Sequence, residues 1–393
     1  MPERIIFTEE FCQPEDLYPF TLTRQIQDIR IGILTIREKW ERLLGAVSYD
    51  KFEDDYKDLD RAVRIDKQLG PGVIYMIHGN LLPTPGLVGA IKRLKNGEFL
   101  SVNGDAGIVF RFSAKEIVKP NQVKMNKAVV IRDEVPTIRF PWDITRLNAT
   151  ALLEDWKLLK GRRKSQPLSR TNRVTKGQQV FVEKGAVVEH AVINATEGPV
   201  YIGKNALVME GSLIRGPVSI GEGAVVKMGT RIYGATTIGP GCVVGGEIKN
   251  SVIFGHSNKA HDGYLGDSVL GEWCNWGAGT TNSNVKNNAG TVRVWTRKGE
   301  IEAGNKCGVF MGDYSRTAIN TSINTGTVIG VSCNVFGSGL TPKYIPSFAW
   351  GSDGLNRYRL EKALDDIRAW KKMKNQLLSM NEESILHTIY NKY

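Results

Sequence analysis

A short stretch rich in polar side chains interrupts an otherwise apolar part of the sequence. Residues 256–267, HSNKAHDGYLGD, hold two histidines, a lysine, a tyrosine and two aspartates. An imidazole titrates near neutral pH, so a histidine here can serve as a general base or, in its neutral form, as a metal ligand. His256 and His261 lie five positions apart. The stretch therefore has the residue types that proton transfer or metal binding requires.

The apolar residues around this stretch recur every six positions. A first series consists of Ile202, Val208, Ile214, Ile220, Val226, Ile232, Ile238 and Val244. A second, offset by two positions, consists of Val252, Asn258, Tyr264, Leu270 and Trp276, and a third of Met311, Thr317, Ile323, Ile329 and Val335. A period of six is typical of short parallel strands that wind into a three-faced prism. We predict this β-helix over residues 176–345, with residues 281–306 leaving it as a loop on the binding face.

The region before the prism has a different pattern. Apolar runs at residues 4–7 and 73–77 indicate buried strands. The expected helices are 28–44, 85–94 and 149–159, the last with Asn148 as its N-cap. We therefore predict an α/β domain with a largely parallel sheet over residues 1–160.

Two further segments complete the expected organisation. Residues 161–175 are strongly basic and are predicted to form a linker. Residues 346–393 are predicted to form a helical tail that starts near Ser352 or Asp353. Its apolar stripe consists of Leu360, Leu364, Ile367, Trp370 and Leu377.

Composition restricts the possible partners and location. The chain has 393 residues and a formal net charge of +11, which suits phosphorylated metabolites, nucleic acid or anionic lipid. The densest basic run, residues 160–173, contains no aromatic residues for stacking bases, so we do not expect nucleic-acid binding. With no signal-like or membrane-length apolar run, we expect a cytoplasmic protein without membrane contact. The five cysteines are scattered without a CxxC pair, so we expect them to be small buried residues.

Residues of the second half resemble the acetyltransferase half of the bifunctional GlmU family, which joins an N-acetylglucosamine-1-phosphate uridylyltransferase to a glucosamine-1-phosphate acetyltransferase. That family shows His-x-x-Tyr-Leu-Gly-Asp followed by Asn-x-Gly-Ala-Gly-Thr. The matching residues here are His261, Tyr264, Leu265, Gly266 and Asp267, then Asn275, Gly277, Ala278, Gly279 and Thr280. The resemblance implies a left-handed β-helix, a homotrimer, and acetyl transfer from acetyl-CoA to the amine of glucosamine-1-phosphate.

The resemblance also implies roles for single residues of the prism. His261 would be the base that accepts a proton from the attacking amine. Arg231 and Lys249 would bind the substrate phosphate, while Tyr264 and Asn275 would bind sugar or phosphate oxygens. The expected acetyl-CoA contacts are Ala278, Asn284 and Asp313. Asp313 departs from the family, which has a serine at that position, so the acyl donor is less firmly assigned than the base.

The segment YPFTLTRQIQDIRIGILTIREKW, residues 18–40, resembles a variant sugar nucleotidyltransferase domain. The resemblance implies that Arg24 and Arg30 bind a triphosphate, and that Asn80 stands in place of a metal-binding aspartate. The expected Mg²⁺ ligands are Asp105, Asp143 and Asn148. This segment has no glycine before Gly32, whereas the family usually has a glycine-rich phosphate loop there.

Four functions remain open from the sequence. In the first, the N-terminal domain transfers uridylyl from UTP, or another nucleotidyl group, and the prism is a working acetyltransferase. In the second, the N-terminal domain is a binding scaffold and the protein is an acyltransferase alone. Alternatively, the prism is only a trimerisation scaffold for a nucleotidyltransferase. The pair His256 and His261 also resembles the zinc ligands of γ-class carbonic anhydrases, but Ile220 stands where that family has its third ligand.

Overall fold

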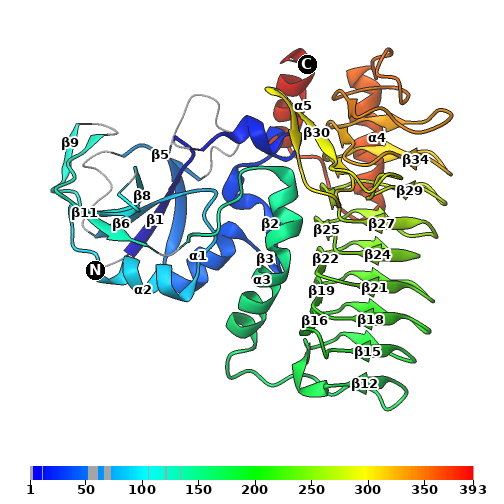
Figure 1. Ribbon diagram of the computed structural model, residues 1–393, viewed down its shortest axis with the longest axis horizontal. Helices are drawn as coiled ribbons and strands as arrows, with labels where there is room; N and C mark the ends of the chain where they lie inside the picture. Colours follow the sequence, from blue (N-terminus) through cyan, green and yellow to red (C-terminus); the bar gives the residue numbers. More distant parts are fainter. Residues whose placement is uncertain are drawn as a thin grey trace. The chain divides into compact units, whose positions relative to one another are not determined.

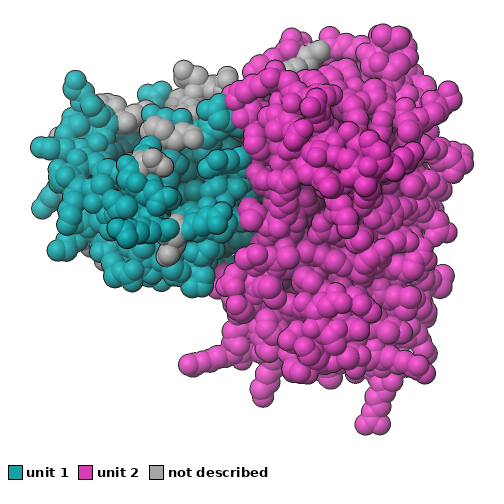
Figure 2. Space-filling model, viewed as in Figure 1, with its two compact units in different colours: residues 1–14, 24–29, 34–139 teal, residues 15–23, 30–33, 140–393 magenta. Residues whose placement is uncertain are grey.

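The computed structural model describes residues 3–10, 12–51, 61–65, 72–104, 106–119, 122–132 and 134–392. The chain divides into two compact units, coloured separately in Figure 2. Unit 1 comprises residues 1–14, 24–29 and 34–139, and unit 2 comprises residues 15–23, 30–33 and 140–393. The division differs from a boundary at residue 160, because the helix from residue 141 belongs to the same unit as the prism.

Unit 1 is built on a seven-stranded sheet in the order β11-β7-β8-β6-β1-β4-β5. The strands are β1 (Glu3–Thr8), β4 (Val47–Lys51), β5 (Ala62–Val63), β6 (Val73–His78), β7 (Glu98–Val102), β8 (Gly107–Phe112) and β11 (Lys127–Ile131). β1 pairs in parallel with β4 and β6, whereas β8 runs antiparallel between β6 and β7. A hairpin of β9 (Ile117–Lys119) and β10 (Gln122–Val123) lies outside this sheet. The predicted strands at 4–7 and 73–77 are confirmed as β1 and β6.

The helices of unit 1 start where the chain supplies a cap. α1 (Ile36–Leu44) begins after Thr35, whose hydroxyl accepts from the Glu38 N–H while the Glu38 carboxylate accepts from the Thr35 N–H. The predicted start at residue 28 is wrong, because residues 26–28 form the short 3-10 helix η3 (Ile26–Asp28) instead. α2 (Pro85–Arg93) follows the Thr84 cap and confirms the predicted helix at 85–94.

Unit 2 is a prism with three faces of parallel strands, and its stacked strands appear as a ladder in Figure 1. Face 1 holds β12 (Arg173–Thr175), β15 (Val192–Asn194), β18 (Leu213–Arg215), β21 (Arg231–Tyr233), β24 (Glu247–Lys249) and β27 (Tyr264–Gly266). Face 2 holds β13 (Val180–Val182), β16 (Val200–Ile202), β19 (Val218–Ile220), β22 (Thr236–Ile238), β25 (Val252–Ile253), β28 (Val269–Leu270), β32 (Phe310–Met311), β35 (Val328–Ile329) and β37 (Tyr344–Ile345). Face 3 holds β14 (Val187–Val188), β17 (Leu207–Val208), β20 (Val225–Val226), β23 (Val243–Val244) and β26 (Asn258–Lys259), and continues through β33 (Arg316–Thr317) and β36 (Asn334–Val335).

Two further strand pairs belong to the upper prism. β29 (Thr281–Asn282) pairs in parallel with β34 (Ser322–Ile323). Within the expected loop 281–306, β30 (Arg293–Thr296) and β31 (Gly299–Glu302) form an antiparallel hairpin. This stacking of parallel strands is consistent with the left-handed β-helix that the resemblance implies, and the predicted fold class is confirmed.

The prism interior follows the six-residue period with one break. Every member of the first and third series is buried. In the second series Ile253, Lys259 and Leu265 point inward in place of Val252, Asn258 and Tyr264, so that part of the prediction is wrong. The cause is two short turns: the inward residues Val244 and Ile248 are four apart and Ile248 and Ile253 five apart, so Lys259 follows Val244 after 15 residues (259 − 244), whereas Val244 follows Val226 after 18 (244 − 226).

Helices cover parts of the prism. α3 (Pro141–Lys160) packs on face 2, and it begins at Pro141 rather than at residue 149, so Asn148 lies inside the helix and is not its N-cap. The tail forms two helices, α4 (Leu360–Met373) and α5 (Met380–Lys392). Leu360, Leu364 and Ile367 are buried as predicted, whereas Leu377 lies between the helices and is 85% exposed. The basic segment 161–175 already includes the first prism strand, β12.

The structure also bears on the predictions about cysteines and membrane spans. All five cysteines are buried and unpaired, which confirms their predicted burial. Among the described residues, no helix is both long and apolar enough to span a membrane.

Candidate functional site

Face 1 places three of the predicted polar residues on one surface. Arg231 pairs with Glu247 and Glu247 pairs with Tyr264, so these residues occupy one column on three successive strands. In the next column Tyr233 pairs with Lys249. Neighbouring strands are about 4.8 Å apart, so Arg231 and Tyr264 lie about 10 Å apart along this face. That span matches the length of a phosphorylated hexose.

His261 lies in the turn that joins β26 on face 3 to β27 on face 1. We call the line of such turns the 3–1 edge; it includes residues 245–246, 260–263 and 277–280. Gly245 donates its N–H to the Lys259 carbonyl (2.7 Å), and Arg231 donates its N–H to the Gly246 carbonyl (2.8 Å). The turn of His261 thus stacks on the glycine turn, which stacks on the strand of Arg231. The structure therefore brings the predicted base to the border of the face that carries both cations.

The cations on face 1 are held but remain accessible. The Arg231 guanidinium lies 3.7 Å from the Glu247 carboxylate and its side chain is 49% exposed. Glu247 also accepts a hydrogen bond of 2.6 Å from the Tyr233 hydroxyl, which raises the pKa of Tyr233. The Lys249 ammonium lies 5.6 Å from the centre of the Tyr233 ring. An anionic group can therefore approach Arg231 and Lys249 from solvent.

Tyr264 is anchored by an amide and a buried carboxylate. Asn284 donates from its side chain to the Tyr264 hydroxyl (3.1 Å) and to Asp267. Asp267 is 7% exposed and also accepts from the Asn250 amide at 2.6 Å. Burial is the main cause that raises the pKa of Tyr264, so its hydroxyl stays protonated at neutral pH and can donate to a substrate oxygen. Asn284 thus supports Tyr264, and its contact with acetyl-CoA stays a prediction.

Asn275 and Ala278 flank the same edge from its other side. Asn275 lies on face 3, where its backbone pairs with Asn258. Ala278 lies in the turn directly beyond that of His261, because the Gly279 N–H donates to the Asp262 carbonyl at 3.1 Å. Both residues are therefore near His261 along the prism, although Asn275 is on a different face from Tyr264.

Asp313 does not lie on the 3–1 edge. It is in a turn between faces 2 and 3, whereas Ala278 is on the 3–1 edge. Its carboxylate accepts from the Glu272 N–H and from the Thr23 hydroxyl, each at 2.8 Å, and the residue is 3% exposed. Within one chain the structure does not bring Asp313 to the other two residues predicted to contact acetyl-CoA. A linear match to a motif does not show on which edge a turn lies.

In unit 1, Asn80 follows β6 at the carboxyl end of the parallel strands. β1 lies between β4 and β6, so the chain connections diverge at this point of the sheet, which is where ligands bind in open α/β sheets. The Gly79 N–H donates to the Thr8 carbonyl at 3.0 Å, and a Cβ on Gly79 would fall 2.3 Å from the Gln27 amide oxygen. Burial lowers the pKa of the neighbouring His78 to about 4, so that imidazole is neutral at physiological pH.

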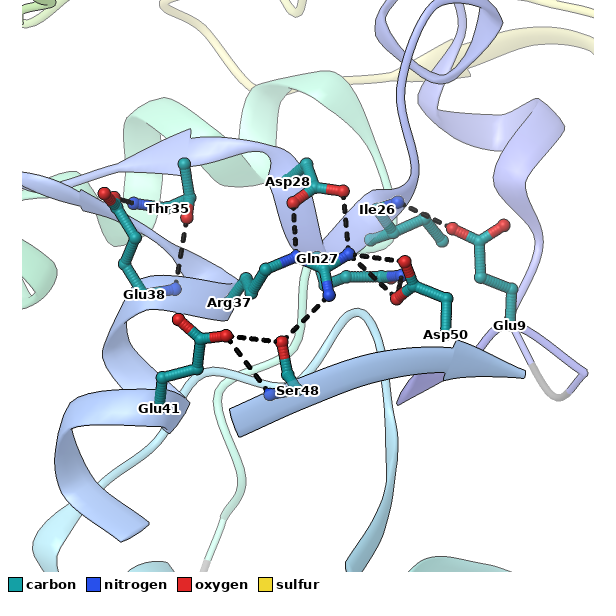
Figure 3. Close-up of polar contacts among 10 residues, drawn as sticks. All are labelled: Glu9, Ile26, Gln27, Asp28, Thr35, Arg37, Glu38, Glu41, Ser48 and Asp50. Atoms are coloured by element: carbon teal, nitrogen blue, oxygen red, sulfur yellow. Dashed lines mark hydrogen bonds and ion pairs between the residues drawn. The ribbon is translucent and has the colours of Figure 1, made fainter. Parts of the chain in front are cut away.

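A buried ion cluster joins η3, α1 and β4 of unit 1 (Figure 3). The Arg37 guanidinium contacts the carboxylates of Asp28 (2.6 Å) and Asp50 (2.8 Å), and Arg37 and Asp50 are almost fully buried. Gln27 donates to Asp50 at 2.6 Å, and Arg37 also donates to the Ser48 hydroxyl. Because each charge has an opposite charge or a donor, the cluster can remain buried and hold η3, α1 and β4 together.

The two arginines predicted to bind a triphosphate lie in different compact units. Arg24 belongs to unit 1 and is half-buried. Arg30 belongs to unit 2, where its guanidinium donates to the carbonyl of Ile33. Triphosphate binding by the pair stays a prediction.

Comparisons with known proteins place this geometry in a family context. Residues 5–164 match the family model described as sugar nucleotidyl transferase. The bifunctional protein GlmU of Methanocaldococcus jannaschii is 35% identical over 101 residues, which is 26% of this chain and 25% of that protein. Over part of its length the chain is thus similar to a sugar nucleotidyl transferase model and to GlmU.

A second relative and a solved structure complete the comparison. The bifunctional sugar-1-phosphate nucleotidylyltransferase/acetyltransferase of Sulfurisphaera tokodaii is 38% identical over 91 residues, or 23% of each chain. The chain thus spans about a quarter of the length of these curated relatives. The solved structure of an Arabidopsis UDP-N-acetylglucosamine acyltransferase matches with a TM-score of 0.28 and 15% identity, covering 58% of this chain and 97% of that one.

Of the three residues predicted to hold Mg²⁺, the two that the structure describes have other partners. Asp105 lies outside the described residues. Asp143 caps α3 by accepting from the Phe140 N–H at 2.9 Å. Asn148 is fully buried; its oxygen accepts from the Gly32 N–H (2.7 Å) and its amide donates to the Ala235 carbonyl (2.7 Å). Asp143 and Asn148 therefore serve the packing of α3, and neither is suited to bind a hard cation.

His256 and His261 of one chain also do not form a zinc site. The His256 ring stacks on Trp273, with centroids 4.6 Å apart, in a turn between faces 2 and 3, whereas His261 lies on the 3–1 edge. Among the described residues, no group of three or more His, Cys, Asp or Glu side chains is arranged to hold a metal ion. The two histidines of one chain are thus not arranged as a shared ligand pair.

Sequence reasoning missed one charged residue beside the predicted base. Lys259 is buried inside the prism, in the position that Val244 occupies one turn below. The lysine was visible in the stretch HSNKAHDGYLGD, but the assumed six-residue register assigned the inward position to Asn258.

Proposed function

We propose that the prism transfers an acetyl group from acetyl-CoA to the amine of a sugar-1-phosphate, glucosamine-1-phosphate in the simplest case. The observation that carries the proposal is the shared location of Arg231, Lys249 and Tyr264 on face 1, with His261 in the turn at the border of that face. A phosphate bound by the two cations would leave the rest of a hexose within reach of the 3–1 edge. The GlmU-like relatives named as acetyltransferases support this assignment.

In this reaction the imidazole of His261 acts as the base. It accepts a proton from the acceptor amine while the nitrogen bonds to the carbonyl carbon of the thioester. The carbon–sulfur bond then breaks, and the thiolate of coenzyme A takes the proton from the imidazolium. Tyr264 orients the sugar through its protonated hydroxyl. The products are the N-acetylated sugar phosphate and free coenzyme A.

For unit 1 we propose nucleotidyl transfer from UTP, or another nucleoside triphosphate, to the sugar-1-phosphate. The match of residues 5–164 to the sugar nucleotidyl transferase model supports it, and so does the position of Asn80 at the diverging strands. Mg²⁺ usually supports this chemistry, but no step is assigned to it because Asp143 and Asn148 do not fit. An acyltransferase with a binding domain remains the second candidate, favoured by the missing glycine-rich loop before Gly32.

A homotrimer in the cytoplasm, where acetyl-CoA and UTP are plentiful, completes the proposal. Outward-facing aliphatic residues flank the 3–1 edge in the lower prism, including Val187 (49% exposed), Val192 (42%) and Leu213 (46%). An apolar strip of this kind is typical of a surface that another copy covers.

Separate readouts on the purified protein test the two activities. Thiol release from acetyl-CoA with glucosamine-1-phosphate reports acyl transfer, and pyrophosphate release with UTP reports nucleotidyl transfer. His261→Ala is expected to reduce acyl transfer by a factor on the order of 10² to 10⁴ and to leave pyrophosphate release intact, while His387→Ala, at an exposed position on α5, serves as the control. Undiminished acyl transfer by His261→Ala would show that another group is the base.

A further inference from the structure

We infer that Lys259 is a positioning residue that holds the turn carrying His261 from inside the prism. This inference rests on the proposed acyl transfer and extends it, because neither the sequence pattern nor the comparisons assign Lys259 a role. Its support comes from the column it occupies, the bond it makes and the turn that it closes.

The column is apolar everywhere below Lys259. On face 3 the inward residues of successive strands pair in register: Val188, Val208, Val226, Val244 and then Lys259. Lys259 is 2% exposed and is among the largest fully buried side chains. A regular rung would have an aliphatic residue here, since an ammonium loses its hydration when it is buried. At the rung that carries His261, the inward aliphatic residue of the repeat is therefore replaced by a lysine.

The ammonium makes one hydrogen bond within the described part of the chain. Lys259 Nζ donates to the carbonyl of His261 at 2.5 Å, so the side chain folds back onto its own turn. The turn below consists of Gly245 and Gly246, and a Cβ on Gly246 would lie 2.8 Å from that same carbonyl oxygen. The absence of a side chain on Gly246 thus lets the His261 carbonyl sit at this position.

Three other turns of the 3–1 edge, at residues 209–212, 227–230 and 318–321, are each closed by a hydroxyl. Four positions after the inward residue, Ser212 donates to the Met209 carbonyl (2.7 Å), and Thr230 donates to the Lys227 carbonyl (2.5 Å). Further up, Thr321 donates to the Ala318 carbonyl at 2.8 Å. Each hydroxyl occupies a carbonyl of its turn and fixes its orientation.

The turn of His261 has a glycine in place of that hydroxyl. The position four after Lys259 is Gly263, which has φ +118, and a Cβ there would fall 2.1 Å from the Thr280 carbonyl oxygen. Serine or threonine does not fit. Lys259 instead bonds this turn from the interior side, at the carbonyl two positions after the inward residue; the three hydroxyls bond the carbonyl one position after it.

Closing the turn from inside has a consequence for the base. The carbonyl of His261 belongs to the same residue as the imidazole, so fixing it restricts the direction of the Cα–Cβ bond. The outer side of the turn stays open, and the imidazole makes no hydrogen bond or ion pair with any described residue. The imidazole therefore stays exposed on a turn whose backbone is fixed from the interior. Burial lowers the pKa of Lys259 to about 8, Asp262 opposes that effect and Arg231 adds to it, so the amino group still donates throughout the neutral range.

Three variants test the inference in the full chain. We expect Lys259→Met to lower kcat for acyl transfer about tenfold, with the KM for acetyl-CoA changed less than twofold. Lys259→Gln, which retains a donor, should recover a large part of the rate. Lys227→Met, a lysine two turns below on the same edge, should have no effect. Pyrophosphate release should be equal in all of them and verifies that the protein is intact.

The base itself provides the decisive comparison. If Lys259 acts through His261, Lys259→Met in a His261→Gln background should not lower the residual acyl transfer further. Equal losses in both backgrounds would overturn the inference, as would a Lys259→Met rate within twofold of wild type, or a Lys259→Gln rate no better than that of Lys259→Met. Full acyl transfer by His261→Gln alone would instead refute the proposed function.

Discussion

The free energy of unfolding offers a sharp test of the buried amino group. Lys259→Met keeps the length of the side chain and removes its charge. Burial lowers the pKa of Lys259 from 10.5 to about 8, a difference of about 2.5 units. One pKa unit corresponds to 1.36 kcal/mol, so the buried ammonium lowers the free energy of unfolding at neutral pH by about 3 kcal/mol. The lost hydrogen bond to His261 offsets about 1 kcal/mol of that gain. We therefore expect the variant to be about 2 kcal/mol more stable at pH 7.

The sign of the pH dependence follows from the two pKa values. Because the folded-state pKa lies below the unfolded value, the unfolded chain binds more protons between pH 8 and 10.5. The stability of the wild type should therefore rise through this window relative to the variant, and the advantage of Lys259→Met should vanish near pH 10.5. Denaturant unfolding followed by circular dichroism at pH 7 and at pH 10 measures both values.

The result that would refute this reasoning is specific. If Lys259→Met lowers the stability at pH 7 by more than 1 kcal/mol, or if the difference is the same at both pH values, the amino group is not desolvated inside the folded prism. A stabilised variant with reduced acyl transfer would have the signature of a functional residue retained at the expense of stability.

The remaining predictions concern the acyl-transfer site on the prism and the buried Arg37 ion cluster of unit 1. His261→Ala should reduce kcat for acyl transfer by a factor on the order of 10² to 10⁴, measured by thiol release. Arg231→Gln or Lys249→Met should raise the KM for the sugar phosphate about tenfold with a smaller change in kcat, since each removes one charge from the phosphate contact; an unchanged KM for both would place the phosphate elsewhere. Arg37→Met, which leaves buried Asp50 without its cation, should destabilise unit 1 by about 3 kcal/mol or more in thermal unfolding.

The parts of the fold that the sequence predicted well are those where one physical rule dominates. The six-residue period specified the interior of the prism because an aliphatic column must stack on itself, and every residue of the first series is buried. The rule failed where one rung loses three residues, two between Val244 and Ile248 and one between Ile248 and Ile253, since shortened turns shift the later inward positions. α1 was placed too early because the capping pair Thr35 and Glu38 outweighs the apolar periodicity before it.

The site was predicted in part for a similar reason. Arg231, Lys249 and Tyr264 lie on strands, so their register carries them to one face. Asp313 lies in a turn, and the match to a family motif did not show that the turn belongs to another edge. Asn148 looked like a polar residue at a helix start, but α3 begins seven positions earlier (148 − 141), and its amide instead bonds Gly32 and Ala235 across the packing surface.

The irregular features of the prism gather in neighbouring rungs, and this placement has a physical reason. Repeat structures are stabilised by contacts between adjacent rungs, so a costly rung is tolerated when its neighbours are regular. The short turn at Gly245, the inward Lys259 and Gly263 with its positive φ all lie between the inward aliphatic residues Val244 and Leu265. Each departure shapes the turn of His261 or the strand next to it. A regular rung would bury an aliphatic side chain in place of Lys259 and would be more stable, but nothing inside the prism would then hold the carbonyl of His261.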